Sequence, residues 1–316
     1  MSEAIRLEPA FDDPGAIRAL IERAGPFEPL AKTAQTDEER ETSAAPAVTF
    51  VPPWFRRNLA TEGNSHVDGV DSILHNPHFI EAARQVFPGS TIVEPTTVYV
   101  NVMAPTPFPF VPHNDIPVFR GADRWNCPVW LLQRMLHSRL FEDERVTLAT
   151  AVTWFYAGTG GSFYYWPDGP EGQAKAEHPP FGNVAIVADN ESVIHGVGTL
   201  GDGAPLASLS FDAMCDHDAA SGDWMIHDQG ESVTHPAADV RITISWKAEV
   251  FADEAERAAT RGASRDLPIE HIVSTFRADL AANGRSTTAP GDPLHDLEWA
   301  ALLEEAYPSA HVRIPR

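Results

Sequence analysis

Residues 111–121, Val-Pro-His-Asn-Asp-Ile-Pro-Val-Phe-Arg-Gly, contain the triplet on which our interpretation of the fold depends. On a β-strand, residues i and i+2 point to the same side. A strand here would direct His113 and Asp115 to one side and Asn114 to the other. An imidazole and a carboxylate placed together can hold a metal ion. We therefore predict that His113 and Asp115 are metal ligands at the mouth of a β-barrel, with a third ligand further along the chain.

A His-x-Asp triplet is a weak signal by itself. With 13 His in the chain, about one such triplet is expected by chance. A second one is present at residues 66–68 (His-Val-Asp), in a polar stretch that we interpret as a helix cap. Residues 216–218 (Asp-His-Asp) follow a similar pattern, and we interpret them as a solvated loop. The alternative that His113 and Asp115 are ordinary loop residues between two prolines stays open.

Composition and charge limit the class of protein. The 316 residues are 43% hydrophobic, which is enough for a substantial core. The chain carries 45 acidic and 23 basic side chains, for a formal net charge of −22. A field of this sign repels phosphate backbones and anionic lipid. We therefore expect neither nucleic acid nor a membrane as a partner, although a local basic pocket could still hold a small anion.

The sequence also indicates a cytoplasmic protein. Residues 1–6 lack the basic start and apolar run of a signal peptide. No apolar stretch approaches the roughly 20 residues of a membrane span. The two cysteines, Cys127 and Cys215, lack the Cys-x-x-Cys spacing, so we expect them to be reduced.

The pattern of hydrophobic residues divides the chain into helices, a β-rich middle and helices again. Helical periodicity is present over 10–24, 71–86, 128–141, 268–283 and 294–307. A loop is expected over 32–46. Short β-branched or alternating stretches predict strands over 91–93, 96–103, the His-x-Asp segment, 147–156, 162–166, 183–189, 192–199, 206–214, 224–227 and 240–251.

This organisation predicts an α+β fold with a mainly β core. We expect one domain over 1–316, with an N-terminal helical part at 1–90, the β core at 91–251 and C-terminal helices at 252–316. The helix at 128–141 is inserted into the core. Segregated helices and strands favour a barrel or sandwich supported by helices over an alternating α/β fold.

The third ligand that we predict is His195. Residues 181–197 consist of a glycine turn, a strand, a polar turn at Asp189 and Asn190, and a second strand that carries His195. Such a turn would return the chain to the first two ligands. Zinc is compatible with this ligand set, but two His and one carboxylate with open positions are typical of non-haem Fe(II) enzymes that activate O2. His195 could instead be a core histidine.

Taken together, these residues resemble the Fe(II)/2-oxoglutarate-dependent dioxygenases. His113-Asn114-Asp115 is similar to the proximal His-x-Asp of that superfamily, and His195 is similar to its distal His. The resemblance covers residues 91–251 and implies a double-stranded β-helix (jelly-roll, cupin-like) barrel, flanked here by N- and C-terminal helices. It implies Fe(II) and 2-oxoglutarate as cofactors and O2 as a co-substrate, with succinate and CO2 as co-products.

The superfamily also places a basic residue on a later strand, where it binds the distal carboxylate of 2-oxoglutarate, and Arg241 fits this role. Alternation puts Arg241, Thr243 and Ser245 on one face of a strand, and Thr243 could add a hydroxyl. His195 and Arg241 are 46 positions apart, which is longer than usual. A β-hairpin insertion over 213–239 would explain the distance. A structural ion pair of Arg241 stays open, as do Arg120 and Lys247 as alternatives.

Further pocket residues are expected around this site. Tyr99 and Asn101 share a face of the strand that precedes the His-x-Asp triplet, so they could contact 2-oxoglutarate or substrate. Trp154 and Tyr164 could line the pocket, and Arg120 could bind a substrate carboxylate.

Three functions are compatible with this interpretation. The first is oxidation of an unactivated C–H bond of a small molecule, most simply hydroxylation. The second is hydroxylation of a protein or peptide side chain, for which the acidic surface would suit a basic target. The third is a jelly-roll protein that binds a small molecule without catalysis. We expect a monomer or a homodimer in each case.

Overall fold

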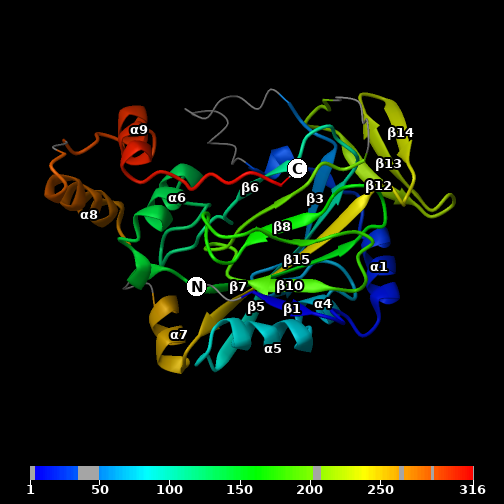
Figure 1. Ribbon diagram of the computed structural model, residues 1–316, viewed down its shortest axis with the longest axis horizontal. Helices are drawn as coiled ribbons and strands as arrows, with labels where there is room; N and C mark the ends of the chain where they lie inside the picture. Colours follow the sequence, from blue (N-terminus) through cyan, green and yellow to red (C-terminus); the bar gives the residue numbers. More distant parts are fainter. Residues whose placement is uncertain (1–3, 35–49, 202–207, 263–266, 286–287, 316) are drawn as a thin grey trace.

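The computed structural model describes residues 4–34, 50–201, 208–262, 267–285 and 288–315. Over these ranges the protein is mainly β, with antiparallel strands in three sheets and helices around them (Figure 1). The predicted loop over 32–46 lies mostly outside the described residues. Its first positions belong to the short helix α2 (Leu30–Ala34).

The largest sheet is built around two long central strands. Their alternating β-branched residues bury one side of each strand against the core. The strand order is β1 (Ile5–Leu7), β10 (Ala185–Ala188), β7 (Leu148–Phe155), β15 (Arg241–Phe251), β5 (Ile92–Met103), β3 (Trp54–Thr61) and β2 (Glu28–Pro29), with β4 (Asn64–Ser65) paired to β3. The predicted strands over 91–93 and 96–103 are therefore one strand. Pro95 is accommodated opposite Ala248, where the register shifts.

Helices cover the apolar face of this sheet. On β15 the side chains of Ile242, Ile244 and Trp246 are buried in the main core. Helix α5 (Pro77–Val86) lies against this face (Figure 1). The ring of Phe79 packs 5.7 Å from that of Trp246. The helix predicted over 71–86 is divided into α4 (Asp71–Leu74) and α5, because Asn76 caps a new helix that begins at Pro77.

The opposite face of the large sheet faces a second, smaller sheet. Its strand order is β6 (Phe110–His113), β11 (Ile194–Val197), β8 (Phe163–Trp166) and β9 (Lys175–Glu177). Residues of both sheets form a shared core, in which Trp54, Met103 and Trp154 of the large sheet join Phe163 and Val197 of the small one. The candidate site lies between these two sheets.

A third sheet lies between His195 and Arg241 in the sequence, where a β-hairpin was predicted. It consists of β12 (Met214–Asp218), β13 (Asp223–Asp228) and β14 (Glu231–His235), so the hairpin predicted over 213–239 is confirmed. Two other expectations were wrong. Residues 216–218 lie in β12 rather than in a solvated loop, and the strand over 206–214 is absent from 208–213, while 202–207 lie outside the described residues.

The remaining helices pack at three places. Helix α1 (Pro14–Arg23) lies near the third sheet, and α7 (Glu254–Arg261) follows β15. The helices α6 (Val129–Ser138), α8 (Ile269–Ala282) and α9 (Leu297–Ala306) share a separate apolar core, at the end of the molecule opposite the third sheet (Figure 1). That core contains Phe141, Phe276 and Trp299. A short 3-10 helix spans Glu142–Glu144.

The first 90 residues are not only helical. They supply β1, β2, β3 and β4 to the large sheet. Strand β3 escaped prediction because its sequence, Trp-Phe-Arg-Arg-Asn-Leu-Ala-Thr, places two arginines and an asparagine where alternation would require apolar residues.

The cysteines and the helices bear on two further expectations from the sequence. Cys127 and Cys215 are both free thiols, as predicted. None of the helices in the described ranges combines the length and the apolar composition that crossing a membrane requires.

Candidate metal centre and pocket

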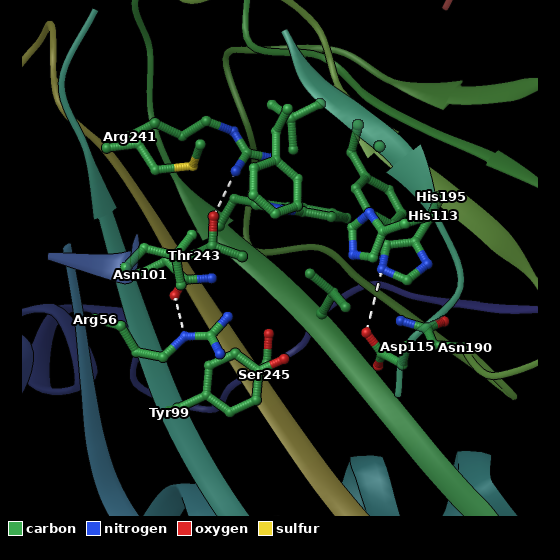
Figure 2. A pocket seen from close by; sticks show the side chains of 18 residues that line it. Arg56, Tyr99, Asn101, His113, Asp115, Asn190, His195, Arg241, Thr243 and Ser245 are labelled. Carbon is green, nitrogen blue, oxygen red and sulfur yellow. Dashed lines mark hydrogen bonds and ion pairs between the residues drawn. The ribbon is translucent and has the colours of Figure 1, made fainter. Parts of the chain in front are cut away.

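The three predicted ligands lie together between the two sheets. His113 is the last residue of β6 and pairs directly with His195 on β11. One ligand atom from each of His113, Asp115 and His195 lies within 4.8 Å of the others. Asp115 Oδ1 is 3.6 Å from His195 Nε2, and the two imidazole centroids are 4.5 Å apart. The cluster is shown in Figure 2.

Asp115 reaches the cluster by a different route from the one predicted. Strand β6 ends at His113, so strand alternation does not place Asp115. Instead, the Asp115 backbone N–H donates to the carbonyl oxygen of Asn190 at 2.9 Å. Asn190 belongs to the turn between β10 and β11, and the same turn leads into the strand of His195.

Both imidazoles are oriented by the backbone. His113 Nδ1 donates to the carbonyl oxygen of Val111 at 3.0 Å, and His195 Nδ1 donates to that of Val193 at 3.1 Å. A carbonyl oxygen only accepts, so in each neutral ring the proton is on Nδ1 and Nε2 keeps its lone pair. Burial, helped by the neighbouring His195, lowers the pKa of His113 to about 4. His113 is therefore neutral at pH 7, as a metal ligand must be.

Asp115 is held by a lysine. Lys247 Nζ donates to Asp115 Oδ2 at 2.6 Å, and the two side chains are only 15% and 12% exposed. Burial opposes ionisation of Asp115, but Lys247 and the two histidines outweigh burial and hold the pKa of the carboxyl well below its usual range. Likewise, burial alone would lower the pKa of Lys247, and Asp115 reverses the shift. Lys247 is thus committed to Asp115, which argues against its alternative role in binding 2-oxoglutarate.

Arg241 is a fully buried cation without an acidic partner among the described residues. Its Nε donates to the carbonyl oxygen of Gly161 at 2.9 Å, and its Nη1 donates to Thr243 Oγ1. Its Nη2 has no hydrogen-bond partner in the described part of the chain. Burial lowers the pKa of Arg241 to about 9. Because Arg241 forms no ion pair with any described residue, the alternative of a structural ion pair finds no support in the structure.

The turn that carries Asn190 is fixed by contacts with Arg145. Arg145 Nη2 lies 2.7 Å from Asp189 Oδ2, and Arg145 Nη1 lies 3.4 Å from Glu191 Oε2. All three side chains are largely buried. Burial, followed by the neighbouring Asp189, raises the pKa of Glu191 well above its usual value.

The pocket itself is built from rows of residues that cross the large sheet. Arg56 on β3 pairs with Asn101 on β5, which pairs with Thr243 on β15, which pairs with Trp154 on β7. Side chains in such a row point to the same face, and all four line the pocket. The next row contains Tyr99, Ser245 and Val152, and the small sheet supplies the opposite wall with Phe110, Phe163, Gly196 and Val197. The volume is about 570 Å³, its open mouth included.

Most of the residues expected at the site line this pocket. They are Tyr99, Asn101, His113, Asp115, Trp154, His195, Arg241 and Thr243. Tyr164 and Arg120 do not line it. Tyr164 alternates with Phe163 and Tyr165 on β8, so its ring points away, toward His178. The Arg120 backbone pairs instead with Glu144 and Leu267.

Three polar pocket residues were not expected at the site: Arg56, Asn190 and Ser245. Ser245 shares the predicted face of Arg241 and Thr243, so alternation alone could have found it. Arg56 lies on the strand that sequence analysis missed. The only available signal was the two arginines between apolar residues at 54–60.

Comparison with known proteins gives a likeness of fold. No protein-family model and no curated protein matches the sequence. Among solved structures, the chain is similar to an oxidoreductase of the 2OG-Fe(II) oxygenase family from Burkholderia pseudomallei, with TM-score 0.41 and 14% identity over 78% of this chain and 84% of that one. It is also similar to a prolyl hydroxylase from Trichoplax adhaerens in complex with a peptide fragment of hypoxia inducible factor, with TM-score 0.43 and 12% identity over 83% and 89%.

A third similar structure is HygX from Streptomyces hygroscopicus with nickel and 2-oxoglutarate bound, with TM-score 0.40 and 8% identity over 78% and 83%. All three TM-scores are below 0.5.

Proposed function

We propose that the protein is an Fe(II)- and 2-oxoglutarate-dependent oxygenase that oxidises an unactivated C–H bond of a small molecule, most simply by hydroxylation. One observation carries the proposal: a cluster of two His and one carboxylate shares a pocket with a buried arginine that has an unsatisfied N–H. Succinate and CO2 would be the co-products.

The donor set fits Fe(II). His113 Nε2, His195 Nε2 and Asp115 Oδ1 would hold the metal. Two neutral imidazoles and one carboxylate are the ligands that non-haem iron oxygenases use, with further positions left open. The outer contacts also fit, since ligating imidazoles usually donate their other N–H to an oxygen and ligating carboxylates are themselves hydrogen-bonded. Lys247 supplies that contact for Asp115.

The pocket also fits a dicarboxylate. A buried guanidinium without an anion is costly, and a carboxylate would satisfy Arg241 Nη2 and neutralise its charge. Figure 2 shows Arg241 across the pocket from the metal ligands. One carboxylate of 2-oxoglutarate would therefore pair with Arg241 while the other end faces the metal. Thr243 would hold the guanidinium in position through its hydrogen bond with Arg241.

When bound, Fe(II) and 2-oxoglutarate would supply the oxidising chemistry with O2, and the protein residues supply orientation and protection. The carbonyls of Val111 and Val193 keep both imidazole protons on Nδ1. Lys247 keeps Asp115 ionised with one oxygen fixed. The apolar walls around Phe163 would keep bulk water from the reacting atoms.

This function also gives an interpretation of the fold. The large and small sheets would be the two halves of a double-stranded β-helix, flanked by the N- and C-terminal helices within one domain over 1–316. The third sheet would then be an insertion before the last core strand, β15.

The test is succinate formation from 2-oxoglutarate in the presence of Fe(II) and O2, measured by mass spectrometry. We expect succinate from the natural protein and none from His113→Ala, which should also lose iron binding. His66→Ala, in the second His-x-Asp triplet, is the matched control and should behave as the natural protein does. A protein that only binds small molecules would form no succinate, and a His113→Ala variant that keeps iron and activity would refute the assigned metal centre.

A further inference from the structure

A second arginine, Arg56, lines the pocket on the same wall as Arg241. Its Nε donates to Asn101 Oδ1 at 2.8 Å. Its guanidinium lies over the ring of Tyr99, 4.2 Å from the ring centroid. The hydrogen bond fixes the position of the guanidinium, and the aromatic ring holds it through a cation–π contact. Arg56 is therefore a preorganised cation.

Arg56 has no acidic partner in the part of the chain that the structure describes. Its Nη1 and Nη2 donate to none of the described residues, and Asp115 is the only acidic residue that lines the pocket. Asp115 is already shared between Lys247 and the metal site. The neighbouring Arg57 differs, because its Nη1 donates to backbone carbonyls, including that of Gly25 at 2.7 Å. A structural role explains Arg57 and leaves Arg56 unexplained.

The proposed cofactors do not use Arg56 either. 2-Oxoglutarate has two carboxylates, of which one would face the metal and the other Arg241. Figure 2 shows Asn101 between Arg241 and Arg56, with the metal ligands on the far side of the pocket. A pocket with two guanidiniums is thus more cationic than one dicarboxylate requires, in a chain whose net charge is −22. The second cation remains for the substrate.

The contacts of Arg56 also indicate the kind of group that it would bind. With Nε engaged by Asn101, the remaining edge of the guanidinium presents Nη1 and Nη2. These two donors match the spacing of the two oxygens of a carboxylate. We propose that Arg56 is a specificity-determining residue that binds a carboxylate of the substrate, so that the substrate is a small carboxylic acid. This inference rests on the proposed function, because it assigns 2-oxoglutarate to Arg241.

The experiment compares ligands that differ only in this group. The probes are N-acetyl amino acids, each paired with its uncharged carboxamide. Their binding to the protein loaded with metal and 2-oxoglutarate, without O2, is measured by calorimetry. Their oxidation in the presence of O2 is followed by mass spectrometry. The variants are Arg56→Met, Arg56→Lys and Arg84→Met, the last being an exposed arginine on α5 that pairs with Glu81 and lies outside the pocket.

We expect the natural protein to bind at least one acid about 10-fold or more tightly than its carboxamide. Arg56→Met should remove that difference, Arg56→Lys should keep part of it, and Arg84→Met should keep all of it. Acids that bind to Arg56→Met as tightly as to the natural protein would overturn the proposal. So would a natural protein that binds none of the acids, or that binds the amides equally well.

Two further readouts separate this inference from the proposed function. If Arg56→Met loses 2-oxoglutarate while Arg241→Met retains it, Arg56 is the cosubstrate anchor and the inference is wrong. If the natural protein forms no succinate but binds acids through Arg56, the oxygenase function fails and the carboxylate site stands.

Discussion

The two carboxylate oxygens of Asp115 make different contacts. One of its oxygens accepts from Lys247 and the other lies 3.6 Å from His195 Nε2. A carboxylate held in this way offers one oxygen to a metal in a fixed direction, which favours monodentate binding. The charge of Lys247 also keeps Asp115 ionised in a buried site, so the ligand is ready before a metal arrives.

The role assigned to Arg241 can be tested by replacing its side chain. Replacing it with Met should weaken 2-oxoglutarate binding about 100-fold, because the carboxylate would lose a buried, charge-assisted partner. Metal binding should be kept, since Arg241 contacts none of the metal ligands. Calorimetry measures both effects, by titrating 2-oxoglutarate into the metal-loaded protein without O2 and by titrating metal into the metal-free protein. Arg120→Met, outside the pocket, is the control, and an unchanged affinity in Arg241→Met would refute its assigned role.

Among the strands, those in which every second residue is apolar could be predicted from the sequence. Strand β15 is the best example, since Ile242 and Ile244 mark the core face and thereby place Arg241 on the pocket face. Strand β3 was missed for the opposite reason. Arg56 faces the pocket and Arg57 bonds to backbone carbonyls, so these polar residues break the hydrophobic pattern on which recognition of a strand depends.

The three predicted metal ligands were placed partly by local sequence pattern and partly by tertiary contact. The turn and strand pattern over 183–197 was sufficient to place His195 on a strand next to His113. The position of Asp115 depended on its hydrogen bond to Asn190, 75 positions later in the chain. No local pattern encodes such a contact. Tyr164 was expected to line the pocket but does not, and the aromatic run Phe-Tyr-Tyr-Trp at 163–166 carries no alternation of polarity that could have shown which side chains face it.

Glu191, in the turn between β10 and β11, should make the stability of the protein depend on pH. The pKa of Glu191 is raised by burial and by Asp189, so the folded protein keeps a proton that the unfolded chain releases near pH 4.3. Stability should therefore fall as the pH rises from there toward the folded-state pKa. Glu191→Gln mimics the protonated form and does not lose this stability. Its Tm relative to that of the natural protein should therefore rise as the pH is raised from 5 to 8.

Thermal unfolding of both proteins across that pH range checks this expectation. Glu298→Gln, at an exposed position on α9, is the control and should follow the natural protein at both pH values. A Glu191→Gln variant that loses Tm relative to the natural protein at pH 8 would show that the ionised carboxylate stabilises the turn through Arg145.

In the whole molecule, the proposed metal centre joins segments that are far apart in the chain. His113 ends β6, Asp115 follows it, and His195 lies in β11, while Lys247 links the centre to β15 of the large sheet. A metal bound there would be a cross-link between the small sheet and, through Lys247, the large one. Because the site exists only in the folded chain, metal binding should stabilise the whole fold.

The expected size follows from mass action. A metal at 100 times its Kd should add about 2.7 kcal/mol to the free energy of unfolding, which raises Tm by roughly 5 °C for a chain of this size. Thermal unfolding without O2, with Fe(II) or a redox-inert divalent metal and after chelation, measures the shift. His195→Ala should abolish it, whereas His66→Ala should leave it intact. A shift of equal size in His195→Ala would place the stabilising metal elsewhere, because removing one of three ligands cannot leave a cross-link between the sheets unchanged.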